Sequence, residues 1–174
     1  MNDYSDLLYT IMSVVIFSFL LLQANSLILR NETVTVDHEF EKTAIAVAQS
    51  IIDEAKTKAF DWAIIDGVDP DEFPGEFLGF GARGGSERES FAVFDDYHFY
   101  NESNENPLIV PTPLGNYTVM ITVDFVDVED VGGVTVVSLP SEPTTFNKRM
   151  TVTASSTAND DFATLVYIKS YFAM

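Results

Sequence analysis

The chain has no cysteine, and residues 1–66 contain neither proline nor glycine. Without cysteine there is no disulfide, so the folded chain has to be stabilised by packing or by assembly. Without proline or glycine, no residue in the first 66 forces a helix to end. These absences allow one long helix, and we expect it to span about residues 3–61.

Basic residues are scarce as well. Nine Lys and Arg stand against 27 Asp and Glu, which gives a net charge of −18 and a pI near 4.1. Because binding to nucleic acid depends on clustered Lys and Arg at the phosphates, nucleic acid is not an expected direct partner. Solubility and mutual repulsion explain the acidic surface, and adaptation to a saline or cation-rich environment is the second interpretation.

Residues that carry catalytic or metal chemistry are few. His38 and His98 are the only histidines, and they lie far apart without cysteine, so neither predicts a zinc site. No nucleophile elbow, phosphate-binding loop or catalytic carboxylate pair stands out. An enzyme is therefore the least supported class, and we expect no cofactor.

What the chain does have is an apolar run over residues 7–29. A helix needs roughly 20 mostly apolar residues to cross a bilayer, and this run is long enough. Asp3 and Asp6 precede it and the first basic residue is Arg30, whereas a secretory signal peptide begins with a basic region and has a shorter apolar core. The pattern predicts a membrane-spanning helix.

The charges around this helix and the features of the rest of the chain predict opposite sides of the membrane for the residues after the helix. If Met1 were the initiator, the positive-inside rule would place Arg30 and all that follows in the cytoplasm. Three Asn-x-Ser/Thr sequons and Gly- and Pro-rich loops instead indicate an exported domain. We therefore expect that a short basic leader preceded Met1 and was removed.

Helical periodicity continues beyond the apolar run and then gives way to strand patterns. Apolar residues fall on one stripe at three- and four-residue spacing, namely Phe40, Ala44, Ala48, Ile51, Ile52, Ala55 and Ala59. We divide the chain into an apolar helix (1–30), its amphipathic continuation (31–65), a Gly- and Pro-rich loop (66–87) and a β head (88–174).

Alternation in residues 117–125 is typical of a half-buried strand, with Tyr117, Val119 and Ile121 on the inward face. Further strands are expected at residues 134–139, and as a hairpin at 148–156 and 163–172. A short strand is expected at 88–94, whereas the three prolines of residues 101–115 predict a crossing loop. The fold class is thus α+β, a long N-terminal helix with an apolar first half, packed on a C-terminal antiparallel sheet.

In this layout the chain resembles type IV pilins and other prepilin-type proteins, over its whole length. The apolar N-terminus, the amphipathic segment 44–60 and the strand 148–154 carry the resemblance. It implies a pilin-like fold, removal of a leader by a peptidase, and residence in the cytoplasmic membrane before assembly. It further implies that assembly machinery builds copies of the chain into an extracellular helical filament, used for adhesion, motility or surface attachment.

The resemblance also names assembly residues. Pilins have an aromatic residue or Met at position one and a Glu at position five, which pairs with a neighbour's N-terminal amine. Met1 fits, but position five is Ser5, so Asp6 is the expected substitute and Asp3 the second choice. Alternatively, both acids lie in a solvated first turn that favours them through the helix dipole. The other expected assembly residues are apolar: Leu7, Ile11, Val14, Phe17 and Leu21.

Small and hydroxyl-bearing residues in the apolar run have two interpretations. They could allow close approach or hydrogen bonds between helices, or the hydroxyls could bond their own backbone carbonyls, which is the commoner case. These residues are Ser5, Thr10, Ser13, Ala24 and Ser26.

Two further kinds of site are candidates. An acidic loop gathers oxygen donors of the kind calcium prefers, although its spacing does not fit an EF-hand and a solvated loop is the alternative; its members are Asp66, Asp69, Asp71 and Glu72. Among the sequons, Asn101 and Asn116 are the credible glycosylation sites, with Asn31 beside the membrane helix.

Two other functions stay open. A pseudopilin of a type II secretion system shares the build but forms a short piston, and calcium at residues 66–72 would favour it. A membrane-anchored extracellular binding domain would be favoured by an intact chain that remains monomeric in detergent.

Overall fold

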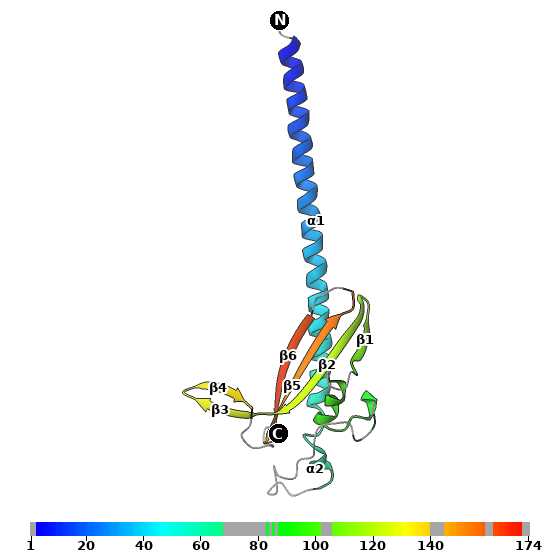
Figure 1. The fold of residues 1–174 in the computed structure, drawn as a ribbon, viewed down its shortest axis with the longest axis vertical. Coiled ribbons are helices and arrows are strands. Elements are labelled where there is room, and N and C mark those ends of the chain that lie inside the picture. The colour runs from blue at the N-terminus through cyan, green and yellow to red at the C-terminus, as the bar shows by residue number, and fades with distance from the viewer. Residues whose placement is uncertain are drawn as a thin grey trace. The chain divides into compact units, whose positions relative to one another are not determined.

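The computed structural model divides the chain into two compact units, the N-terminal unit (residues 1–40) and the C-terminal unit (residues 41–174) (Figure 1). The structure describes residues 3–67, 83, 85, 87–101, 106–139, 145–158 and 162–171, apart from the side chains of Asp3 and Thr33.

The N-terminal unit is helical throughout its described residues. Its helix, α1 (Asp3–Lys56), continues into the C-terminal unit, which confirms the long helix expected from the missing proline and glycine. α1 stops a few residues before the expected end because Thr57 N and Lys58 N bond carbonyls three residues back, which tightens the last turn. Lys169 Nζ then donates to the carbonyls of Lys56 and Lys58 and so caps this end.

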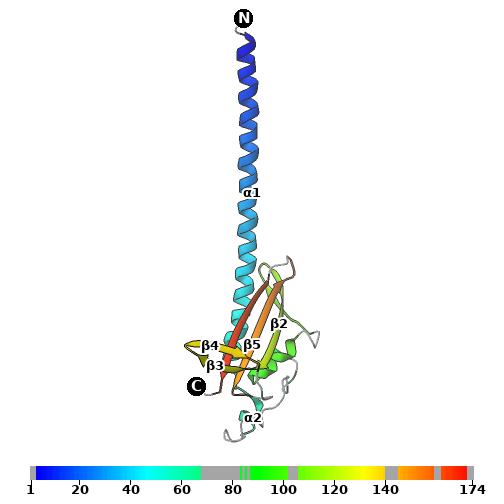
Figure 2. The same cartoon turned by 60° about the vertical axis from the view of Figure 1, so that its left-hand side comes forward.

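The C-terminal unit contains a four-stranded antiparallel sheet in the order β1-β2-β5-β6 (Figures 1 and 2). Its strands are β1 (Leu108–Thr112), β2 (Gly115–Phe125), β5 (Asn147–Ser156) and β6 (Phe162–Ser170). The register sets Ile121 opposite Val152 and Val152 opposite Leu165. The predicted strand at 117–125 and the predicted C-terminal hairpin are therefore confirmed.

A separate two-stranded ribbon is formed by β3 (Asp127–Val131) and β4 (Val134–Ser138). Gly132 and Gly133 join the two strands with φ of 66° and 85°, the left-handed pair that a tight hairpin turn requires. Both views show this ribbon projecting from one end of the four-stranded sheet (Figures 1 and 2).

The core lies between the last turns of α1 and the inward faces of β2 and β5. Every second residue of β2 from Tyr117 to Phe125 is buried, and the predicted apolar stripe of α1 is buried from Ala44 to Ala55. β5 alternates in the same way, but its inward row begins with a charged residue, reading Lys148, Met150, Val152 and Ala154. The α+β arrangement is as predicted.

Two predictions about local structure are wrong. The expected strand at 88–94 is replaced by 3₁₀ helices, η2 (Arg88–Ser90) and η3 (Phe94–Tyr100), because Asp96 Oδ2 accepts from Ala92 N and Val93 N and holds the chain in a turn. The expected crossing loop contains β1. Its Pro111 is tolerated because β1 is at the sheet edge, where one side of the strand makes no ladder bonds.

Candidate functional site

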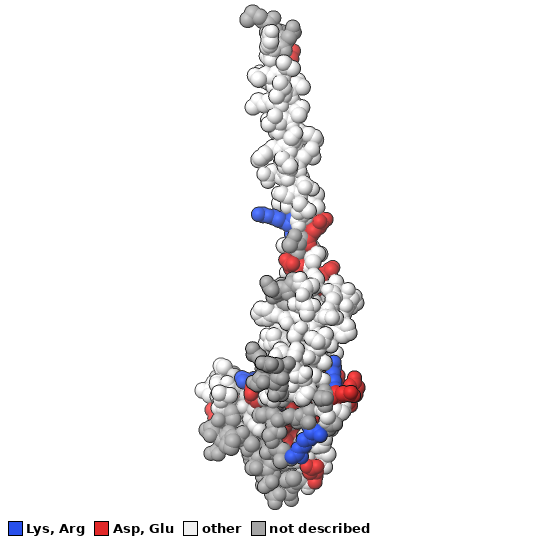
Figure 3. All heavy atoms as spheres, turned by 45° about the vertical axis from the view of Figure 1, so that its right-hand side comes forward, with Lys and Arg blue, Asp and Glu red and all other residues white. Residues whose placement is uncertain are grey.

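The candidate assembly surface is the apolar stretch of α1 over residues 7–29, within the N-terminal unit. By length and composition α1 could cross a membrane, and none of its most apolar window is buried. Figure 3 shows one face of this stretch without Lys, Arg, Asp or Glu atoms. Each predicted apolar assembly residue is more than half exposed, and their spacing places them on one stripe of the helix: Leu7, Ile11, Val14, Phe17 and Leu21.

Hydroxyl groups on this helix are turned onto its own backbone. Thr10 Oγ1 donates to Asp6 O at 2.8 Å, Ser13 Oγ to Thr10 O at 2.8 Å, and Ser26 Oγ to Gln23 O at 3.1 Å. Ser18 does the same toward Val14 O. Thr10, Ser13 and Ser26 thus bond their own backbone carbonyls, as the second interpretation of these residues expected. Their hydroxyl groups are satisfied within the helix, so the helix surface offers fewer free polar groups than its composition suggests.

The predicted register charges lie at the start of this stretch. Asp6 is exposed in the first turns of α1. Met1 and the side chain of Asp3 lie outside the described residues. Pairing of Asp6 or Asp3 with a neighbouring subunit therefore stays a prediction.

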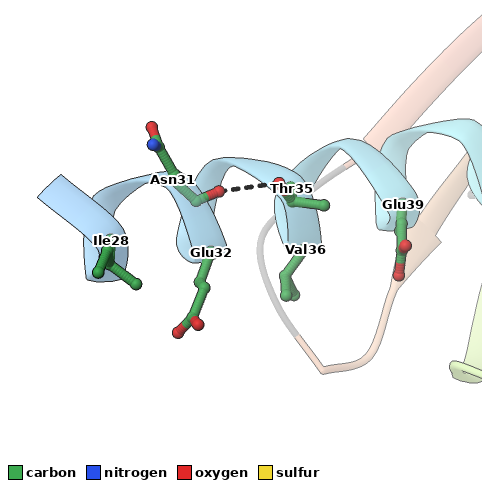
Figure 4. A pocket seen from close by; sticks show the side chains of 6 residues that line it. All are labelled: Ile28, Asn31, Glu32, Thr35, Val36 and Glu39. Atoms are coloured by element: carbon green, nitrogen blue, oxygen red, sulfur yellow. Dashed lines mark hydrogen bonds between the residues drawn. The ribbon is translucent and has the colours of Figure 1, made fainter.

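At the end of the apolar stretch, α1 carries a shallow groove whose lining residues, among those that the structure describes, all come from this helix (Figure 4). Ile28, Glu32 and Val36 point to one side of the helix in the close view, and Thr35 Oγ1 donates to Asn31 O at 2.8 Å. With walls from a single helix, the groove is an open feature of the helix surface that cannot enclose a ligand.

The β3-β4 ribbon is a second exposed apolar surface, within the C-terminal unit. Two-stranded ribbons are marginally stable alone in water, and this one turns valines outward from both strands. The exposed members of the ribbon and its end are Val128, Val131, Val134, Val136, Val137 and Leu139.

The acidic loop proposed for calcium is described only at its start. Asp66 is exposed, and its Oδ2 lies 3.4 Å from Arg83 Nη1. Asp69, Asp71 and Glu72 lie outside the described residues. Within the described part of the chain, no three His, Asp or Glu side chains come together as metal ligands.

The three sequons differ in exposure. Asn116 is exposed on β2 and Asn31 on α1, so both present their amides to solvent. Asn101 is only 5% exposed, and its Nδ2 donates to His98 O at 2.7 Å. The folded chain therefore does not offer Asn101 to a glycosylating enzyme, and Asn116 is the better remaining candidate of the two called credible.

Sequence reasoning missed a group of three buried charged residues in the C-terminal unit, which we call the buried triad: Asp61, Asp95 and Lys148. Lys148 Nζ on β5 lies 2.5 Å from Asp61 Oδ2, just before α2 (Trp62–Ile65), and 2.5 Å from Asp95 Oδ2 in η3. All three side chains are at most 3% exposed. The sequence could have predicted the burial of Lys148, because Lys148 alternates in step with the inward-facing apolar residues of β5.

Local contacts set the triad's geometry. Asp61 caps α2, with its Oδ1 accepting from Ala63 N at 2.9 Å. The neighbouring Asp96 accepts from Trp62 Nε1 at 2.9 Å, which ties η3 to α2 and so brings Asp95 beside Asp61. Burial raises the pKa of Asp95 to about 7; the Lys148 ammonium opposes this shift, and the Asp61 carboxylate adds to it.

A second polar cluster joins α1 to the 3₁₀ segment. Glu54 pairs with Arg88 and accepts from Tyr97 Oη at 2.5 Å. Burial disfavours the ionised carboxylate, but these partners outweigh it and lower the pKa of Glu54. These contacts fix the 3₁₀ segment to α1, and we interpret the cluster as structural.

Comparison with known proteins gives no further guide. No protein-family model, curated protein or solved structure matches this chain.

Proposed function

We propose that this chain is a structural subunit that self-assembles, through residues 7–29, into an extracellular type IV pilus-like filament. The observation that carries the proposal is the exposure of the apolar stretch around the helix, with none of its most apolar window buried. An apolar surface of this length requires either lipid or other copies of itself.

The lateral surface of the helix suits both environments in turn. Because its hydroxyls bond their own carbonyls, lipid chains meet few unsatisfied polar groups. In lipid no hydrophobic force drives helices together, and van der Waals packing between helices decides association. A subunit of this kind can therefore wait in the cytoplasmic membrane and exchange lipid for neighbouring helices.

The C-terminal unit supplies a folded head for the outside of such a filament. The chain's charge of −18 suits a solvent-exposed surface and opposes non-specific aggregation. The ribbon's exposed valines are a second surface that contact between subunits would cover. The head's outward surface would serve adhesion or surface attachment.

Electron microscopy of sheared surface material, with N-terminal mass spectrometry of the same protein, tests the proposal. The expected result is thin filaments made of this chain with a processed N-terminus at Met1. An unprocessed monomer in the membrane fraction would contradict the proposal and favour a membrane-anchored extracellular binding domain. Short assemblies found only with a secretion machine would favour a type II pseudopilin.

A further inference from the structure

The buried triad combines a nucleophile, a carboxyl carbon and a proton carrier in one buried site. Lys148 Nζ has three acceptors in reach, the carboxylates of Asp61 and Asp95 at 2.5 Å each and Phe60 O at 3.1 Å. These use all three protons of an ammonium. Asp95 Oδ1 is buried and makes no hydrogen bond within the described part of the chain.

Aromatic rings form part of the walls around the amine. Nζ lies 4.5 Å from the centroid of the Phe60 ring and 4.9 Å from that of Phe125. The amine and both carboxyl groups are at most 3% exposed, so bulk water does not solvate them in the folded chain. In water the ionised forms prevail, and an ammonium and a carboxylate do not condense.

We propose that Lys148 and Asp61 condense to an intramolecular amide bond, with Asp95 as the proton relay. The proposal is independent of filament assembly, since it concerns the interior of the C-terminal unit.

The geometry suits attack on Asp61. Because the carboxyl carbon is one bond from Oδ2, a contact of 2.5 Å places Nζ at roughly the 3–3.5 Å that separates reacting atoms in a near-attack arrangement. Ala63 N donates to the other oxygen of Asp61 at 2.9 Å, where negative charge develops during the attack. Oδ1 therefore remains as the amide oxygen, and Oδ2 is the leaving atom.

Asp95 is placed to move the protons. Its Oδ2 contacts Nζ, and its pKa, raised to about 7, lets it both donate and accept near neutral pH. The other oxygen of this carboxyl group, Oδ1, makes no hydrogen bond to any described group, so it can take up a proton.

The reaction balances without an added reagent. The Nζ–Cγ bond forms and the Cγ–Oδ2 bond breaks, while two of the three ammonium protons leave with Oδ2 as water. Asp95 carries protons from Nζ to Oδ2 and returns to its starting state. The chain is neither oxidised nor reduced, and the product is an amide between β5 and the segment that follows α1.

Such a bond would give a cysteine-free chain a covalent link between two of its elements. It would join Asp61, five residues beyond the end of α1 at Lys56, to the first inward position of β5. A pulling force on α1 would then reach the sheet through a covalent bond in addition to packing. Unfolding of the head would also leave a closed loop, which restricts the unfolded chain.

Intact mass spectrometry of the full chain, purified in detergent and denatured, tests the proposal. The expected mass is lower than that of the sequence by one water molecule. Trypsin then separates two outcomes, because Asp61 lies in fragment 59–83 whereas Asp95 and Lys148 lie together in 89–149 when Lys148 is blocked. The proposal requires fragments 59–83 and 89–149 to be joined.

Three results would overturn it. The first is a wild-type mass equal to that of the sequence. The second is a water lost within fragment 59–83 alone, as ring closure at Asp66-Gly67 would produce. The third is a link confined to fragment 89–149, which would mean that Asp95 is the bonded residue.

Variants separate chemistry from folding. Asp95→Asn keeps the shape and the Lys148–Asp61 ion pair but removes the relay, so we expect a folded chain with the full sequence mass. Asp61→Ala is expected to give the full mass as well, and a persistent loss of water there would reject Asp61. The matched control is Asp53→Ala, which removes an exposed Asp 2.9 Å from Lys56 and should retain the loss.

Discussion

The apolar helix of residues 7–29 and the interior of the C-terminal unit place the same kinds of side chains in opposite positions. On the helix, Phe17 is 62% exposed and charged residues stand only at the two ends. In the C-terminal unit, Lys148 is buried, with its Nζ 4.5 Å from the centroid of the Phe60 ring and 4.9 Å from that of the Phe125 ring. Each placement is unfavourable for a monomer in water, so each requires a specific explanation.

The two placements differ in where the compensating contacts come from. The buried triad finds its partners inside the same chain, as three charges within hydrogen-bonding reach. The described helix surface has its hydroxyls satisfied locally, but the atoms that would cover its apolar side chains are not part of this chain's described fold. The exposed apolar side chains lack covering atoms within the described fold, which is why we propose lipid and other copies of the chain as their surroundings. The buried charges have their partners within the C-terminal unit.

The largest expected effect on function, the loss of filaments, comes from placing a charge on the apolar helix. Phe17→Asp puts a charge near the middle of the apolar stretch, at a cost of about 2.5–3.5 kcal/mol for membrane insertion. We expect loss of membrane retention and of filaments, measured by fractionation and electron microscopy. Ile109→Asp is the matched control, since Ile109 is 50% exposed on β1; an equal loss there would show that the effect is not specific to the helix.

The next effect comes from removing the triad's cation. Lys148→Ala removes the partner of Asp61, in the ion pair and in the proposed amide alike, and leaves two buried carboxyl groups without a cation. Breaking a buried pair in this way costs about 3–5 kcal/mol of unfolding free energy, and loss of the amide adds to that cost. Denaturant unfolding of the full chain in detergent, followed by circular dichroism, measures it. Lys56→Ala removes a pair with the exposed Asp53 and should cost much less, because solvent screens surface pairs. Equal costs would show that burial of the triad contributes nothing special.

A smaller effect is expected at the start of the apolar helix. Asp6→Ala should leave the subunit folded in the membrane but lower filament yield, because the predicted partner of Asp6 is the N-terminal amine of a neighbouring subunit. Quantitative imaging of sheared filaments measures the yield. Glu32→Ala removes an exposed acid beyond the other end of the run and should have no effect; unchanged yield in Asp6→Ala would reject the register role.

The smallest effect concerns the pH dependence of the head. Burial lowers the pKa of His98, Asp124 opposes the shift, and Nδ1 accepts from Val123 N at 3.0 Å only while it is unprotonated. The unfolded chain therefore binds this proton more readily, and stability falls as pH falls through the ordinary value of 6.5.

His98→Asn keeps an acceptor and removes this titration. We expect its Tm to gain on that of the wild type as the pH drops below about 6.5, the ordinary pKa of histidine. The difference between the two proteins isolates His98 from Asp95, whose raised pKa acts in the opposite direction: Asp95 stabilises the fold in acid and loses that contribution as the pH rises through about 7. A pH-independent difference would contradict the contribution of His98.

Periodicity made much of the fold predictable. The missing proline and glycine permitted one helix, and the alternation at 117–125 and in the C-terminal hairpin predicted strands that the structure contains. The same reasoning failed where a single side chain overrides a local pattern. Asp96 bends residues 92–96 into a turn, and the edge position of β1 accommodates Pro111.

The sequence by itself determined the apolar stretch, the helix that carries it and the inward rows of the main strands, because these depend on spacings of two to four residues along the chain. Only the tertiary structure decided the environment of Lys148. Its partners are 87 and 53 residues away, and no local pattern encodes which carboxylates meet an inward lysine. That meeting depends on the packing of α2, η3 and β5 around one point, and so does the chemistry proposed for it.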